Sequence, residues 1–194
     1  MGRSPTFENK EAVQKAMHLF WRKGYEHCSL ADLLEVMEIG NGSFYNTFGS
    51  KKKVFMLALE QYYAEAAERL REIFASKLPI QEMMRAMFQY AIERQLDAEC
   101  PKGCFIVNTV SADAIDDPDI LRQVRYYLDT YEQTLEKVLA RAVQHQQLDP
   151  SIDPRNTAAV LNFYLQGLMK LSLLDYPVAK LQQQTEYFLT AMGL

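Results

Sequence analysis

The chain has 194 residues, of which 48% are hydrophobic and 24% charged, and its formal net charge is −4. This composition is typical of a folded globular protein, and the length allows one compact domain or two small ones. No apolar run approaches the roughly 18 residues of a membrane span, and the N-terminus lacks the apolar core of a signal peptide. We therefore expect a cytoplasmic protein with no membrane partner, and three cysteines argue against a disulfide framework.

The charge is distributed unevenly along the chain. Residues 1–55 hold eight Lys and Arg against six acidic residues, which gives +2, whereas the remainder holds 13 basic and 19 acidic residues, which gives −6. A mildly basic head on an acidic body favours an anionic partner for the head. A solvated charged surface is the alternative explanation of such a split.

Two helices are predicted first along the chain. The first starts near Glu8 and ends at Lys23, before a Gly suited to the left-handed residue after a helix. The second follows Ser29, a good N-cap, and Asp32 stands where its carboxylate can close the cap. In both helices the apolar residues recur at i, i+3, i+4 and i+7, at Val13, Ala16, Met17 and Phe20 and at Leu30, Leu33, Leu34 and Met37.

A third, short helix is predicted from about Asn41, which is a plausible cap. Phe44 and Phe48, four residues apart, lie on one face of this helix, and Gly49 and Ser50 end it. Together, residues 30–48 read as helix, tight turn and short helix, which is the arrangement of a helix-turn-helix DNA-binding unit. An ordinary helical hairpin is the alternative.

The rest of the chain also predicts helices, so we expect an all-α fold. The expected elements are a long helix over 51–75, a helix over 80–97, a loop and short helix over 99–113, a long helix from Pro118, an apolar helix over 155–175 and a last helix from Pro177.

The stretch "GYEHCSLADLLEVMEIGNGSFYNTFGSKKKVF" resembles the N-terminal domain of the TetR family of transcriptional regulators. The matching features are Gly-Tyr after the first helix, Ser29 before the second, Phe44-Tyr45 in the third, and the Phe-x-Ser-Lys that ends at Lys51. The resemblance covers residues 1–60. It implies a three-helix helix-turn-helix domain over residues 1–50 and a helical effector-binding and dimerisation domain over residues 51–194.

Glu38 departs from the family pattern, which usually has Gly at this turn position. A positive φ at this residue would carry strain of about 1 kcal/mol or more. We expect either that Ile39 holds the turn by packing into the core or that the turn takes another shape.

Small polar side chains on the third helix fit the task of reaching base edges in the major groove. A Gly lets the backbone approach closely, an aromatic hydroxyl can bond a phosphate, and a helix N-terminus is a natural phosphate site. An N-terminal Arg can reach the minor groove. The expected DNA-binding residues are Arg3, Ser29, Asn41, Gly42, Ser43, Tyr45, Asn46, Thr47 and Lys51, and the resemblance implies these roles for Ser29, Tyr45, Thr47 and Lys51. We expect Lys52 and Lys53 to be mainly solvated.

The apolar helix over 155–175 needs more than one packing partner because it is apolar almost all round. We expect the last two helices to pair with those of a second subunit in a two-fold homodimer; a fully intramolecular core helix is the alternative. The expected interface residues are Leu161, Leu165, Leu168, Ser172, Leu181 and Phe188. Met and aromatic residues of the body are core residues or line an effector pocket, and the candidates are Tyr62, Met87, Tyr90, Cys104, Phe105, Asn108, Tyr127, Tyr131 and Phe163.

The cysteine pair in "CPKGC" allows the protein to be released from operator DNA by thiol chemistry, as an alternative to release by an effector. Cys104 begins the short helix, whose dipole favours a thiolate, Lys102 adds positive charge, and Cys100 could act as a resolving thiol. The segment also resembles the corresponding helix of electrophile-sensing TetR-type repressors. A small buried hydrophobe is the alternative reading of Cys104.

Enzyme chemistry is the rival class of function. The three His lie far apart without a nucleophile motif, phosphate loop or metal spacing, and no ligand completes a zinc site beside the cysteines. We expect no cofactor and no metal. The sequence predicts a dimeric repressor on a double-stranded DNA operator, released by a small-molecule effector, with thiol sensing through Cys104, a regulator without an effector, or an all-α enzyme as alternatives.

Overall fold

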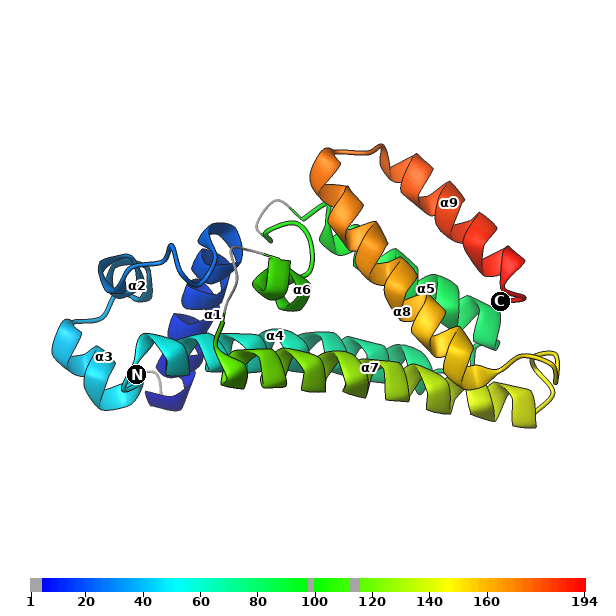
Figure 1. Ribbon diagram of the computed structural model, residues 1–194, viewed down its shortest axis with the longest axis horizontal. Helices are drawn as coiled ribbons and strands as arrows, with labels where there is room; N and C mark the ends of the chain where they lie inside the picture. Colours follow the sequence, from blue (N-terminus) through cyan, green and yellow to red (C-terminus); the bar gives the residue numbers. More distant parts are fainter. Residues whose placement is uncertain (1–4, 98–99, 112–115) are drawn as a thin grey trace. The chain divides into compact units, whose positions relative to one another are not determined.

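The computed structural model describes residues 5–97, 100–111 and 116–194, and every regular element in these ranges is helical (Figure 1). None of these helices is long and apolar enough to cross a membrane. In chain order the elements are α1 (Pro5–Lys23), α2 (Leu30–Met37), α3 (Asn41–Thr47), α4 (Lys51–Phe74), α5 (Ile80–Arg94), α6 (Phe105–Ser111), α7 (Pro118–Gln144), α8 (Pro154–Leu171), the 3-10 helix η1 (Ser172–Leu174) and α9 (Val178–Ala191).

The all-α prediction is confirmed, with small differences at helix ends. The N-cap of α3 is Gly40, not Asn41, and this residue has no side chain that could cap the helix. α5 ends at Arg94 instead of near residue 97. The single helix predicted over 155–175 is α8 followed by η1. Helix α8 begins at Pro154 because Asp153 caps it and Pro is well suited to the first helical position.

The chain divides into two compact units that are each built from two stretches of sequence. Unit 1 contains the chain up to Ala66 and residues Phe105–Arg125, and unit 2 contains Ala67–Cys104 and Tyr126–Leu194. Helices α4 and α7 therefore each contribute to both units. The division differs from the boundary after residue 50 that the sequence suggested, which stays a prediction.

Unit 1 has an aromatic core. Phe20 and Phe55 meet edge to face with ring centroids 4.9 Å apart, and Trp21 and Tyr62 do the same at 4.9 Å. Phe105 of α6 joins them, with its ring 5.6 Å from that of Phe55. Edge-to-face pairs at these distances add to the burial of large rings, so the core positions α1, where α2 packs.

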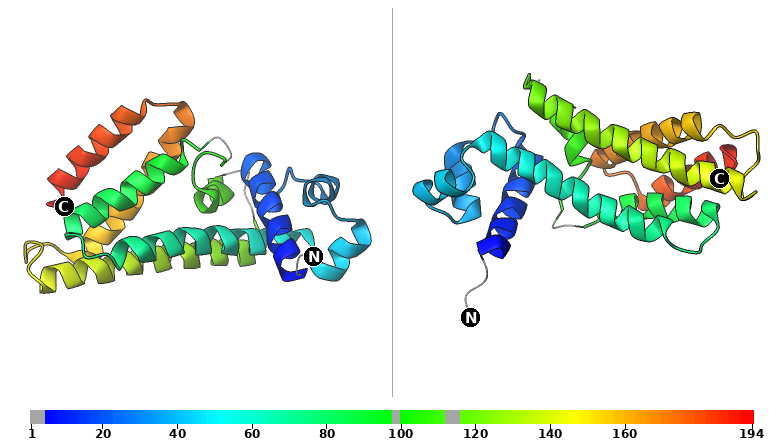
Figure 2. Two further views of the ribbon diagram at one scale, coloured as in Figure 1. Left: turned by 180° about the vertical axis from the view of Figure 1, so that it is seen from behind. Right: turned by 90° about the horizontal axis from the view of Figure 1, so that it is seen from below.

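Unit 2 is organised around α5, which packs against α8 and α9; Figures 1 and 2 show these three helices side by side. Tyr164 of α8 and Phe188 of α9 stack with centroids 3.8 Å apart, and Phe88 of α5 meets the Tyr164 ring edge-on. Arg85 and Glu186 add a two-pronged ion pair between α5 and α9.

Candidate nucleic-acid interface

The N-terminus of α2 is closed by a reciprocal cap. The Ser29 hydroxyl accepts from the Asp32 amide at 3.1 Å, and the Asp32 carboxylate accepts from the Ser29 amide at 2.9 Å. Lys23 donates to the same carboxylate at 2.9 Å. The Lys23 ammonium, followed by the Ser29 amide and hydroxyl, lowers the Asp32 pKa from 3.8 to about 2. The cap fixes where α2 begins, with the Ser29 side chain exposed at its end.

The turn between α2 and α3 places Glu38 in the left-handed region, at φ 57°. The Glu38 amide donates to the Glu35 carbonyl and the Ile39 amide to the Leu34 carbonyl, each at 3.2 Å. These two bonds form a Schellman motif, which holds a left-handed residue after a helix. An ion pair of Glu38 with Lys15 at 2.8 Å adds a contact to α1. Hydrogen bonds therefore fix this turn, and Ile39 is only partly buried.

Helix α3 separates its aromatic anchors from its polar side chains. The Phe44 and Phe48 side chains are 0% and 6% exposed. Tyr45 is 51% exposed and meets the Phe44 ring edge-on, with centroids 5.5 Å apart. The exposed residues of this helix are Asn41, Gly42, Ser43, Tyr45, Asn46 and Thr47. They coincide with the residues predicted to read DNA.

Apart from its chain neighbours and the backbone of its own helix, no atom of the described residues lies within 4 Å of a Cβ built on Gly42. Packing among the described residues therefore gives no reason for Gly at this exposed position.

Lys51, at the start of α4, lies over the ring of Tyr25, with Nζ 4.5 Å from the ring centroid. The Tyr25 ring rests in turn on Phe55, with centroids 4.7 Å apart. Sequence reasoning used Tyr25 only as part of a family motif and missed this platform, since a cation–π contact between residues 26 positions apart has no local signal. Arg3 lies outside the described residues.

Lys52 is not mainly solvated. Its Nζ lies 2.7 Å from an oxygen of Asp119 and 2.9 Å from one of Asp117, at the start of α7. Lys53 is exposed, and its amide donates to the Ser50 hydroxyl that caps α4. The three consecutive Lys thus have three different surroundings.

The effector candidates are divided between the two units. In unit 1, the Tyr62 and Phe105 rings pack 5.8 Å apart, and the buried Asn108 Oδ1 has no hydrogen-bond partner in the described part of the chain. In unit 2, the Tyr131 hydroxyl donates to the Met87 sulfur at 3.1 Å. Burial and then the nearby Cys104 raise the Tyr131 pKa.

The remaining effector candidates are scattered within unit 2. Tyr127 is buried, and Tyr90 is half-buried with Arg69 5.8 Å from its ring centroid. Phe163 is 73% exposed on α8, so its side chain does not line the interior of the chain.

The expected dimer residues lie mostly inside the chain's own core. Leu161 is fully buried, Phe188 is half-buried against Tyr164, and Leu165, Leu168, Ser172 and Leu181 are buried. A different set forms the exposed apolar surface of α8, η1, α9 and their connections: Val160, Phe163, Leu171, Leu173, Leu174, Tyr176 and Tyr187. We call this set the α8–α9 apolar face.

The cysteine loop is anchored within unit 2. The buried Gln95 Oε1 accepts from the Gly103 amide at 2.6 Å and lies 2.9 Å from the Ser172 hydroxyl. Lys102 is paired with Asp175. Cys104 is 8% exposed and precedes α6. Burial, and then a hydrogen bond to Asp97, raise the Cys100 pKa. In the ranges that the structure covers, no cluster of His, Cys, Asp and Glu suits a metal ion.

An exposed polar helix on aromatic anchors, held behind a capped helix and a hydrogen-bonded turn, defines a helix-turn-helix DNA-binding protein. Comparison with known families agrees. Residues 7–56 match the family described as bacterial regulatory proteins, tetR family, and residues 81–188 match the tetracyclin repressor-like C-terminal domain. The chain belongs to the TetR family of transcriptional regulators, and it is a DNA-binding repressor, not an enzyme.

Individual relatives cover nearly the whole chain. It is 29% identical over 168 residues to the HTH-type transcriptional repressor ComR of Escherichia coli K12, which is 86% of this chain and 80% of ComR. It is 26% identical to a cysteine-substituted CifR complexed with 26-bp double-strand operator DNA, with a TM-score of 0.88 and coverage of 98% and 99%. The reduced form of E. coli NemR has the same fold, with a TM-score of 0.82 at 22% identity and coverage of 94% and 96%.

Proposed function

We propose that this repressor binds a double-stranded operator as a homodimer and leaves it when a small molecule occupies its helical body. The observation that carries the proposal is the pair of exposed surfaces. One is the polar side of α3, with Phe44 and Phe48 buried behind it. The other is the α8–α9 apolar face. Polar side chains suit base edges, whereas a group of large exposed apolar side chains suits a protein partner.

A second copy of the chain is the partner proposed for the α8–α9 apolar face. Phe163 and Tyr187 are 73% and 74% exposed, and exposed aromatic side chains of this size are common anchors at interfaces. A two-fold dimer presents two recognition helices to successive major grooves, about 34 Å apart on B-DNA. CifR, a relative of similar length, is described in complex with 26-bp operator DNA, which is long enough for two such half-sites.

Buried polar groups support the effector part of the proposal. Asn108 Oδ1 is a buried acceptor without a partner among the described residues, and such groups are costly unless something bonds them. Tyr131 is part-buried and its hydroxyl donates to the Met87 sulfur, which is a weak acceptor. Within either unit taken by itself, a ligand with an apolar body and a polar group that bonds this side chain, Asn108 in unit 1 or Tyr131 in unit 2, would match its surroundings.

Three measurements test the proposal. Selection of duplexes from a random pool should yield a palindromic operator, and the repressor should sediment as a dimer. A thermal-shift screen with a panel of phenols, aromatic amines and quinones should then find compounds that raise the melting temperature and release the operator. Compounds that raise it without releasing DNA would count against the effector mechanism.

A thiol-sensing release is the second candidate, favoured by the place of Cys104 close to Tyr131 and Met87. Modification of Cys104 would enlarge a buried side chain in the same neighbourhood that an effector would occupy. The burial of Cys104, the pairing of Lys102 with Asp175 and the raised Cys100 pKa favour small electrophiles over a fast disulfide switch.

The thiol mechanism predicts a difference between two proteins. A small electrophile such as methylglyoxal or hypochlorite should release DNA from the wild type at concentrations that leave Cys104→Ser bound, with mass spectrometry showing modification of Cys104. Equal release from both proteins would leave the pocket effector as the proposed mechanism.

A further inference from the structure

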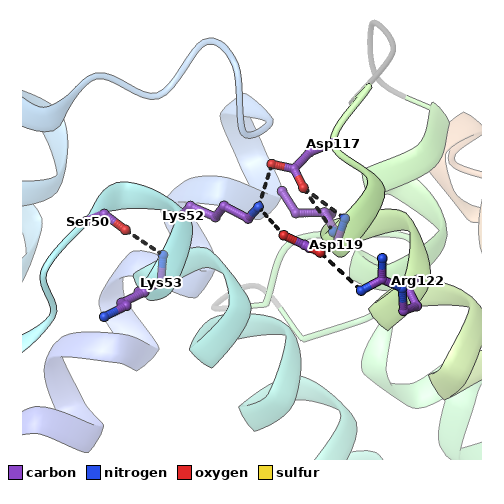
Figure 3. Close-up of polar contacts among 7 residues, drawn as sticks. Ser50, Lys52, Lys53, Asp117, Asp119 and Arg122 are labelled. Atoms are coloured by element: carbon purple, nitrogen blue, oxygen red, sulfur yellow. Dashed lines mark hydrogen bonds and ion pairs between the residues drawn. The ribbon is translucent and has the colours of Figure 1, made fainter.

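Lys52, in the first turn of α4, is held by two carboxylates from the other stretch of unit 1. Figure 3 shows its ammonium between Asp117 and Asp119, at 2.9 and 2.7 Å. The hydrogen bonds to Asp119 and then Asp117 raise the Lys52 pKa, and Lys52 in turn lowers the pKa of both carboxyl groups. Both carboxylates thus hold the ammonium that would otherwise be available to a phosphate.

Both carboxylates are themselves fixed to α7. One oxygen of Asp117 accepts from the backbone amides of Asp119 and Ile120, at 3.0 and 3.3 Å, and its other oxygen bonds Lys52. Asp117 therefore caps α7 and binds Lys52 at the same time. Asp119 bonds Lys52 through one oxygen and Arg122 through the other, at 3.1 Å (Figure 3).

The segment that Lys52 fixes is the one that meets DNA. Ser50, which caps α4, and Lys51, which lies over the Tyr25 ring, directly precede Lys52, and α3 ends at Thr47. The Tyr25 pKa is raised, first by burial and then by Glu26 and Asp117, while Lys52 opposes the rise. The phenol of Tyr25 thus lies within the field of the ion-paired cluster, and its ring supports Lys51.

We propose that Lys52 is a positioning residue for operator binding: held by Asp117 and Asp119, it fixes the first turn of α4 to the first turn of α7 and so orients Lys51 and α3. We call these three residues the Lys52 clamp. The clamp does not touch DNA. Because α7 continues from Arg125 in unit 1 to Tyr126 in unit 2, the clamp also ties the DNA-contacting segment to a helix that enters the effector-binding half of the chain.

When both carboxylates are removed, the clamp and a phosphate contact of Lys52 predict changes of opposite sign in the affinity for DNA. Substituting both carboxylates, Asp117→Asn with Asp119→Asn, removes two negative charges and frees Lys52, so a Lys52 that bound phosphate would bind DNA as tightly as before or more tightly. If Lys52 positions α4 and α3 instead, the variant removes its two partners and binding to DNA becomes weaker. Asn caps helices about as well as Asp, so α7 keeps its start in this variant.

The experiment measures affinity for a duplex selected by the wild type from a random pool and for a random duplex of the same length, over a range of salt. The double Asn variant should bind the selected duplex about three- to tenfold more weakly, the low end of coupling within an ion-pair network. Lys52→Gln should lose as much affinity for the selected duplex without lowering the salt slope. The variant with all three substitutions should bind this duplex no more weakly than either of the other two variants. Lys53→Gln, which removes the same charge one residue away, is the control and should have less effect on the selected duplex.

Unchanged or tighter binding by the double Asn variant would overturn the clamp, as would a salt slope reduced by about one in Lys52→Gln, the signature of a lost phosphate contact. Melting temperatures show whether each variant is folded. Because the double Asn variant and Lys52→Gln both remove the ion pairs of the clamp, one of them can serve for the test if the other unfolds. A wild type that selects no duplex would count against DNA binding itself, which is a different failure.

Discussion

Helix α3 and the last two helices differ in how far their most exposed aromatic side chains reach into solvent. At α3, Phe44 and the following Phe48 are buried and Tyr45 is half-exposed among small and polar residues, whereas in α8 and α9 Phe163 and Tyr187 are almost three-quarters exposed. Aromatic rings that the chain buries serve its own fold, and those that it leaves exposed are available to a partner. This difference is the basis for proposing a polar partner for one surface and an apolar partner for the other.

The largest expected effect comes from placing a charged side chain on the α8–α9 apolar face. Phe163→Glu places a charge where a second subunit would pack. Each of the two copies loses about 2 kcal/mol of binding free energy at this anchor, so the dissociation constant of the dimer should rise about a thousandfold. Sedimentation equilibrium measures it, and operator affinity should fall with it. Leu78→Glu changes an exposed apolar residue that does not belong to this set and should leave the dimer intact. A dimer unaffected by Phe163→Glu would exclude this face as the interface.

The second effect sharpens the role of the polar surface. Asn46→Ala should cost on the order of 1–3 kcal/mol at a contacted base and relax the preference there, because a hydrogen bond to a base edge is lost. A binding selection repeated with the variant shows the change. If the preferred sequence stays the same while affinity falls, Asn46 positions the helix and does not read bases.

A smaller and sequence-independent effect is expected for Lys51→Ala. Removing one phosphate contact should weaken binding to all duplexes alike and reduce the salt slope by about one. Titrations of selected and random DNA across salt measure both quantities. An unchanged slope would show that the Lys51 ammonium serves its contact with Tyr25 and not DNA.

The smallest effect concerns the acid stability of unit 1. The pKa of Asp32 falls from 3.8 to about 2 on folding, so between these pH values the unfolded chain binds the proton more readily. Stability from this carboxylate is therefore complete above about pH 4 and is lost as the pH falls towards 2. Asp32→Asn should make the urea midpoint depend less steeply on pH in that window. An identical pH dependence in variant and wild type would contradict the ion pair with Lys23.

Local signals predicted the helix caps of the N-terminal stretch well. The cap of Ser29 with Asp32 and the cap of α4 by Ser50 join residues three apart in the chain, so their geometry follows from the helix itself. Glu38 has the positive φ that the family comparison raised, and the Schellman bonds to α2 explain how a non-glycine residue is held there.

The orientation of α8 could not be predicted because its apolar residues surround the helix. With no polar side to set the phase, sequence reasoning placed Leu161 at the interface and Phe163 inside, whereas the structure buries the first and exposes the second. The Lys52 clamp was missed for another reason. Lys52 and Asp119 are 67 positions apart, and the sequence around Pro118 predicted only the start of a helix.

The discontinuous make-up of unit 1 limits how hybrid regulators can be assembled from this chain. A hybrid that takes only residues up to Ala66 from one repressor and the rest from another would pair its α1–α3 with a foreign α6 and a foreign start of α7. Lys52 would then face carboxylates only if the donor supplied them. A hybrid that transplants residues 105–125 together with the N-terminal stretch keeps the Phe105 ring and both Asp partners, and it is the more promising way to redirect this repressor to a new signal.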